Sequence, residues 1–172
     1  MRPDAVRIDL DERQIRQAAN VGVSRQLAAL RKRRPGAYGN NNGDAWTQHI
    51  EGCGGELAGC IYYGLEWNAY ADELRDYGGK KIADGSREVE FRTRIKFENY
   101  QLIVHPNDAD DRPFVLVVGL MPTYYIQGWM LGREAKRKEW WSDPSGKNRP
   151  AYFVPTPELH SPKDLKEFLK LD

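Results

Sequence analysis

The chain has 172 residues, of which 40% are hydrophobic and 30% are charged, and its formal net charge is +1 at pH 7. This length fits one domain with a single core, and the balanced charge argues against both disorder and a surface that binds nucleic acid all over. No apolar run approaches the roughly 20 residues of a membrane-spanning helix, and the first residues lack the apolar stretch of a secretory signal. We therefore expect a cytoplasmic protein without a membrane partner.

Two long helices are predicted in the first part of the chain. Apolar side chains recur at helical spacing over residues 11–33, and Pro35 and Gly36 end that segment. A Gly/Asn-rich loop follows. The second helix is expected to begin at Asp44, a good N-cap, and to end at Gly64, a natural stop.

From residue 87 the pattern changes to a period of two. Residues 89–97 alternate apolar and charged side chains, which predicts a strand with one apolar and one charged face. Three further strands, a late strand and a closing helix are predicted at 102–104, 114–118, 125–130, 151–154 and 162–171. Because the first strands follow one another closely, the sequence favours an antiparallel meander. Helices followed by a meander indicate an α+β, or mixed α/β, domain.

The segment 83–94 carries the strongest local signal for chemistry. Glu90 and Arg92 are two residues apart in the predicted strand, so they share a face about 6.7 Å apart, and Asp84 precedes them in an Asp-Gly turn. Mg²⁺ typically binds one or two carboxylates together with waters and phosphate oxygens. Asp84 and Glu90 could supply those carboxylates, and Arg92 could hold a phosphate oxygen or orient a water. The competing interpretation is a strand whose outer face is merely charged.

Glycines crowd the second predicted helix and surround a carboxylate. Each of the four glycines between residues 52 and 59 disfavours a helix by about 1 kcal/mol relative to Ala, which indicates close approach of another element. Glu56 lies among them, and a carboxylate on a packed face needs a partner. A cation shared with Asp84 and Glu90 would supply one.

Cys53 and Cys60 lie in the same helix, together with His49. A zinc site along this stripe is excluded, because His49 and Cys60 would be about 16 Å apart along the helix axis. We interpret the cysteines as small buried apolar residues.

Two basic clusters could bind phosphates, although such runs are usually solvated faces. The first comprises Arg31, Lys32, Arg33 and Arg34, and the second comprises Arg133, Lys136, Arg137 and Lys138. Trp140 and Trp141, beside the second cluster, could stack on bases, but such tryptophans more often lie in a core or an interface.

Taken together, these features resemble the PD-(D/E)XK, or restriction-endonuclease-like, nucleases, and among them a group of small bacteriophage and prophage proteins. The resemblance rests on Gly55-Glu56 in the helix, Asp84-Gly85 in the turn, Glu90-Phe91-Arg92 in the strand, and the later segments FVLVVGLMPTYYIQGWMLGREAK and PAYFVP. It covers about residues 45–157. It implies a restriction-endonuclease-like mixed central sheet flanked by helices, in a single domain spanning 1–172 to which residues 1–43 add an N-terminal helical extension.

The resemblance also implies roles for these residues. Asp84, Glu90 and Glu56 would bind Mg²⁺ or Mn²⁺, and Arg92 would stand where the superfamily usually has Lys. Because Arg stays charged it cannot act as a general base, so water activation would fall to the metal and Arg92 would stabilise charge on the phosphate. The implied function is hydrolysis of phosphodiester bonds in DNA in the host cytoplasm, with Arg94 and the two basic clusters holding the backbone.

Two other functions stay open. One is a nucleic-acid-binding module on the same fold that has lost catalysis, and the other is a phage interaction protein whose charged strand is only a solvated face. Metal titration separates the nuclease from the interaction protein, and a cleavage assay with Mn²⁺ separates it from the binding module. The sequence leaves open the choice between DNA and RNA, the structure of the substrate, and the oligomeric state, a homodimer included.

Overall fold

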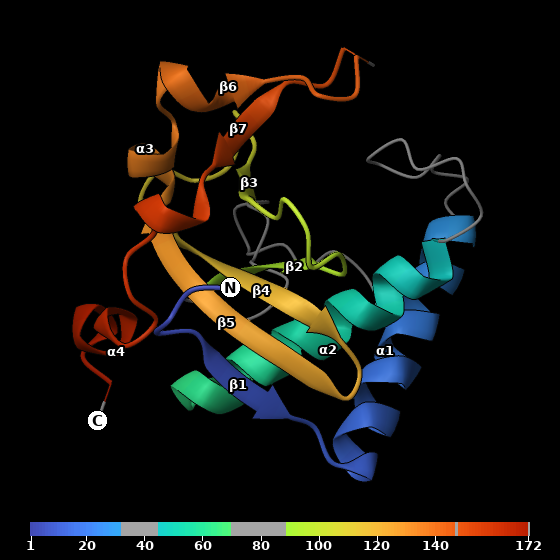
Figure 1. Cartoon of the computed structure of the whole chain (residues 1–172). Helices are drawn as coiled ribbons and strands as arrows, with labels where there is room; N and C mark the ends of the chain where they lie inside the picture. Colours follow the sequence, from blue (N-terminus) through green and yellow to red (C-terminus); the bar gives the residue numbers. More distant parts are fainter. Residues whose placement is uncertain (32–44, 70–88, 147, 172) are drawn as a thin grey trace, which may run out of the picture.

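The computed structural model describes residues 1–31, 45–69, 89–146 and 148–171. They form two sheets and several helices, so the predicted α+β class is confirmed (Figure 1). The four-stranded sheet has the order β1-β5-β4-β2, and its strands are β1 (Val6–Asp9), β2 (Glu90–Arg94), β4 (Pro113–Leu120) and β5 (Thr123–Leu131). The three-stranded sheet has the order β3-β7-β6, and its strands are β3 (Leu102–Val104), β6 (Trp141–Ser142) and β7 (Ala151–Val154). The helices are α1 (Glu12–Arg31), α2 (Ala45–Tyr63), α3 (Gly132–Ala135), α4 (Asp164–Leu169) and the short 3-10 turns η1 (Lys138–Trp140) and η2 (Thr156–Glu158).

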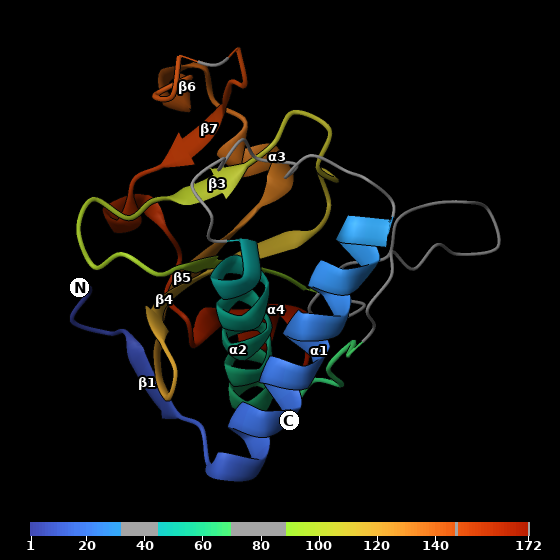
Figure 2. The same ribbon diagram turned by 90° about the vertical axis from the view of Figure 1, so that its right-hand side faces the viewer.

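Helices α1 and α2 lie side by side (Figure 2), and α2 is the one that contacts β2 and β4. A capping box begins α1, because Asp11 and Gln14 each accept a backbone hydrogen bond of 2.8 Å from the other. The two helices approach closely at Gly22, where a Cβ would lie 2.8 Å from the backbone nitrogen of Ile50. Within the described residues, no helix is long and apolar enough to span a membrane.

The glycines of α2 make room for side chains of the sheet. A Cβ on Gly55 would collide with Thr93, and a Cβ on Gly59 would collide with the ring of Phe91. The close approach inferred from the sequence is therefore confirmed. Because side chains alternate along a strand, Phe91 and Thr93 face α2 while Glu90 and its neighbours of the same parity project from the opposite face of β2.

The predicted meander is wrong for β2 and β3. β2 pairs with β4 in parallel, with Glu90 opposite Phe114, and β3 leaves for the second sheet, where it pairs with β7. Of the strands in the predicted meander, β4 and β5 do form an antiparallel pair of successive strands. The reason is visible in β4, whose Val115, Leu116, Val117 and Val118 are all fully buried. Such a strand needs a neighbour on each edge and cover on both faces.

Strand β1 is a part of the central sheet that the sequence pattern did not reveal. It pairs antiparallel with β5, with Val6 opposite Ile126, and its burial alternates over only four residues. The first 31 residues therefore supply an edge strand of the central sheet in addition to the expected helix.

Candidate active site

Glu90 begins β2 and is only 4% exposed. One carboxylate oxygen, Oε1, accepts a hydrogen bond of 2.7 Å from Nη1 of Arg92, and the other, Oε2, lies 3.8 Å from Nη1 of Arg112. The register partner of Glu90, Phe114, belongs to the second buried cluster, on the face away from α2. At Glu90 the charged face of β2 is therefore enclosed, and the interpretation as a merely solvated face does not describe this residue.

Arg92 joins two carboxylates. Its Nη2 donates to Oδ2 of Asp108 at 2.9 Å, and its guanidinium lies 5.3 Å from the centroid of the Phe114 ring. Glu90, Arg92, Asp108 and Arg112 together are called the acid–arginine cluster below. One guanidinium thus brings two carboxylates from separate segments of the chain to the same place.

Asp108 was not selected from the sequence. It lies between β3 and β4, where its Oδ2 also accepts a hydrogen bond of 2.8 Å from the backbone nitrogen of His105. Lys136 holds the same loop, because its Nζ donates to the carbonyl oxygen of Asp108 at 2.6 Å and to Oδ1 of Asp110 at 2.5 Å. The run of aspartates in HPNDADDRP is the sequence signal that could have pointed to this residue.

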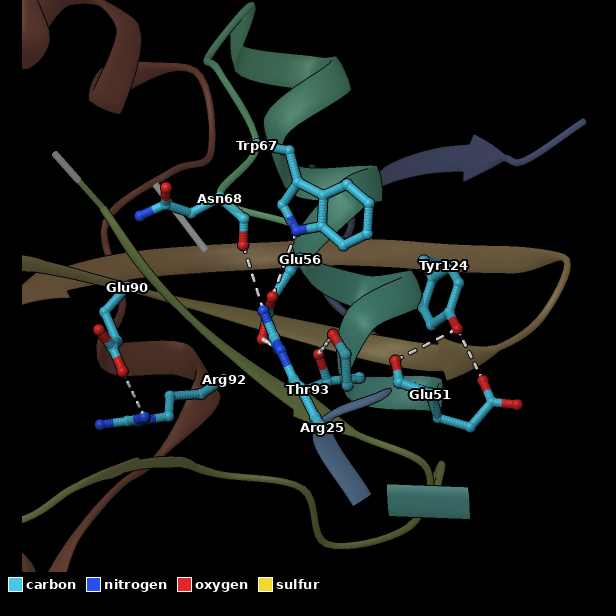
Figure 3. Close-up of polar contacts among 10 residues, drawn as sticks. Arg25, Glu51, Glu56, Trp67, Asn68, Glu90, Arg92, Thr93 and Tyr124 are labelled. Atoms are coloured by element: carbon cyan, nitrogen blue, oxygen red, sulfur yellow. Dashed lines mark hydrogen bonds and ion pairs between the residues drawn. The ribbon is translucent and has the colours of Figure 1, made fainter. Parts of the chain in front are cut away.

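Glu56 has found a different partner from the one expected. It is 7% exposed, and its Oε1 accepts a hydrogen bond of 2.8 Å from Nη1 of Arg25 in α1. Its Oε2 accepts another of 3.2 Å from Nε1 of Trp67. The Arg25 guanidinium also donates to the carbonyl oxygen of Asn68 at 3.2 Å (Figure 3). The need for a partner is confirmed, but a guanidinium meets it.

The structure does not bring Glu56 and Glu90 together. Glu56 lies on α2, on the face of β2 that Phe91 and Thr93 share, whereas Glu90 projects from the other face. Each carboxylate has its own arginine partner. Asp84 lies outside the described residues.

Glu51, the other carboxylate of α2, fastens the helix to the β4–β5 turn. Its Oε2 accepts hydrogen bonds of 2.6 Å from the Tyr124 hydroxyl and 2.9 Å from the backbone nitrogen of Met121. Burial, together with this carboxylate, raises the pKa of Tyr124 well above its ordinary value. Glu51 is thus committed to a structural contact.

The second basic cluster lies beside the loop that carries Asp108. The backbone nitrogen of Arg133 donates to the carbonyl oxygen of Asp110 at 2.9 Å, and Lys136 holds the loop as described above. Arg137 lies over the ring of Trp140, 4.6 Å from its centroid. Of the first cluster, Arg31 is exposed at the end of α1, and residues 32–34 lie outside the described part of the chain.

Trp140 and the two cysteines are buried, whereas Trp141 is exposed. Trp140 is buried in the second core cluster, while Trp141 is 43% exposed and packs on Tyr152. Cys53 and Cys60 are both buried and form no disulfide, as expected for small residues of the core.

Two carboxylates of the acid–arginine cluster, Glu90 and Asp108, are the candidate ligands for a divalent cation. Among the described residues, no group of three or more His, Cys, Asp or Glu side chains is arranged to hold a metal ion. Glu90 and Asp108 do converge on one guanidinium. Mg²⁺ typically needs only one or two carboxylates and completes its shell with water and phosphate oxygens. Glu90 and Asp108 therefore fit it by donor type, and a bound ion would have to share them with Arg92.

Comparison of the chain with protein-family models, with characterised proteins and with solved structures finds no match. What the chain does must therefore be argued from the site itself.

Proposed function

We propose that the chain is a metal-dependent nuclease that hydrolyses phosphodiester bonds in DNA, with its active site at the acid–arginine cluster. One observation carries the proposal: the buried carboxylate of Glu90 lies on the same face of β2 as two arginines, Arg92 and Arg94. Phosphodiester hydrolysis needs an acid that can hold a cation next to a donor that can hold phosphate charge.

We also propose that the fold is restriction-endonuclease-like. A mixed sheet with α2 on one face, α1 packed beside α2, and the strand that carries Glu90 at one edge is consistent with the restriction-endonuclease-like arrangement that the sequence motifs imply.

Each residue of the site would have a distinct task. Glu90 would hold Mg²⁺ or Mn²⁺ together with Asp84 or Asp108. The metal, when bound, would lower the pKa of a bound water and polarise the phosphate. Arg92 keeps its charge at every relevant pH, so it would bind a phosphate oxygen and could not take a proton from water. Glu56 would not touch the substrate, because it lies on the other face of β2 from Glu90, where Arg25 and Trp67 hold its carboxylate.

A second candidate function is a nucleic-acid-binding module without catalysis. It is favoured by the fact that Arg92 and Arg112 already balance the carboxylates of Glu90 and Asp108. A cluster balanced in this way does not depend on a cation for stability.

The deciding experiment is cleavage of plasmid and branched DNA by the purified chain in Mn²⁺, in Mg²⁺ and in EDTA. We expect metal-dependent products from the parent and none from Glu90→Gln, which keeps the shape of the side chain but removes its charge. Glu98→Gln, an exposed carboxylate just beyond β2, is the matched control and should cleave normally. Equal cleavage by parent and Glu90→Gln would reject the site. Binding without cleavage by the parent would support the second function instead.

A further inference from the structure

Arg94 differs from the other partly buried arginines around the site. Arg25 is paired with Glu56, while Arg92 and Arg112 are paired with Glu90. Arg94 is partly buried as well, and burial lowers the pKa of its guanidinium below the ordinary value. Yet within the described part of the chain it makes no ion pair and no hydrogen bond through its side chain.

Arg94 is only partly buried, and its nitrogens are not among the buried side-chain atoms that lack a hydrogen-bond partner, so its head group still reaches solvent. Buried charges are normally paired or bound to an oppositely charged group. The stem of Arg94 can pack on apolar side chains, since its register partner Val118 is fully buried. That packing explains the position of the stem and leaves the donors of the head group open to water or to a ligand. A ligand with anionic oxygens would supply acceptors for them.

The position of Arg94 suggests which anion. Arg92 and Arg94 project from the same face of β2, about 6.7 Å apart along the strand, which is close to the separation of successive phosphates in a nucleic-acid strand. A guanidinium is a fork of donors that can bind two oxygens of one phosphate.

We propose that Arg94 binds a backbone phosphate of a nucleic-acid strand that runs along β2, one nucleotide from the phosphate at Arg92. The register with Arg92 rests on the proposed nuclease function. The phosphate contact of Arg94 rests only on its own surroundings, so it can be tested without cleavage.

The test is binding of a fluorescein-labelled oligonucleotide, followed by anisotropy in EDTA at several NaCl concentrations. Arg94→Gln should weaken binding by about tenfold, the lower end of what a charge-assisted hydrogen bond supplies. The slope of log affinity against log salt should become shallower by about 0.7 for a single strand. Arg7→Gln is the matched control: it removes the same charge from an exposed residue on β1, at the opposite edge of the sheet, and should leave both quantities unchanged.

Thermal melting of the same variants separates a ligand contact from a structural one. Arg94→Gln should melt at the parental temperature or above it, because no protein partner of the guanidinium is lost and a partly buried charge is removed. Arg94→Lys should restore most of the salt slope, since it returns the charge without the fork. Loss of binding together with a lower melting temperature, not restored by Arg94→Lys, would overturn the proposal in favour of a packing role.

Three other outcomes would also overturn it. They are parental affinity and slope in Arg94→Gln, no oligonucleotide binding by the parent, and binding of inorganic phosphate alone. If the parent binds through Arg94 but never cleaves in Mn²⁺, the nuclease proposal fails and this one stands. If the parent cleaves DNA and Arg94→Gln binds the oligonucleotide normally, only the proposal for Arg94 fails.

Discussion

Arg92 is the residue whose role most directly distinguishes catalysis from structural pairing. If it stabilises phosphate charge, Arg92→Lys should keep appreciable activity and Arg92→Ala should lose roughly 10² to 10³ in rate, the usual effect of removing one transition-state donor. The measurement is a single-turnover rate at saturating Mn²⁺, normalised to the folded fraction, because Arg92 also pairs with two carboxylates. Near-parental cleavage by Arg92→Ala would reject a catalytic role.

The pair of Arg25 and Glu56 should contribute to stability in a way that surface pairs do not. Arg25→Met leaves a buried carboxylate without its guanidinium, which should lower the free energy of unfolding by about 3 kcal/mol. Combining it with Glu56→Leu should recover most of that loss, because no unpaired charge then remains buried. Urea denaturation measures both.

Arg16 provides the comparison for that pair. It bonds Glu12 at 2.6 Å, but both side chains are largely exposed, so Arg16→Met should change stability by less than about 1 kcal/mol. If Arg25→Met were equally mild, the pair with Glu56 would be only a weak contact.

At the scale of elements, the glycines of α2 should respond to alanine with opposite signs. Gly59→Ala puts a methyl group into the Phe91 ring and should destabilise by about 1–3 kcal/mol. Gly52→Ala meets nothing within 4 Å and should stabilise by about 0.5–1 kcal/mol, because alanine favours a helix. Thermal or urea unfolding of the two variants checks the signs. Stabilisation by Gly59→Ala would mean that α2 does not approach β2 this closely.

At the scale of the whole molecule, the N-terminal residues are tied to the C-terminal part of the chain. Arg2 donates to the carbonyl oxygens of Thr156 and Leu159, and it forms a 2.8 Å ion pair with Asp4. The hydrogen bond from Arg2 lowers the pKa of Asp4 from 3.8 to about 2. This contact brings the segment before β1 against η2.

The pH dependence follows from the sign of that shift. A carboxyl whose pKa is lower in the folded state stabilises the fold above its unfolded pKa and loses that contribution as pH falls through the folded value. The contribution of Asp4 should therefore be complete above pH 4 and disappear towards pH 2. Melting temperatures of the parent and Asp4→Asn should differ at pH 5 and converge near pH 2. Asp111→Asn, at an exposed aspartate, is the control. A difference in melting temperature between the parent and Asp4→Asn that persists at pH 2 would contradict this role of Asp4.

The sequence by itself determined most of the local structure. Helical spacing and stop signals placed α1 and α2 within a few residues of their observed bounds. The apolar run at 114–118 marked the strand β4, and the glycines of α2 indicated a close neighbour. These features depend on a residue and its near neighbours, which is why a local pattern can reveal them.

Only the tertiary structure decided which distant elements meet. It paired β2 with β4 in parallel, gave Glu56 the guanidinium of Arg25, and brought Asp108 to Arg92. The alternation of side chains in β2 required Glu90 and Arg92 to share a face. It did not determine which side chains would cover that face. Several distant residues have side chains that could pair with a buried carboxylate. The packing of the whole core decides which of them does so, and the local spacing of residues in the sequence contains no information about that packing.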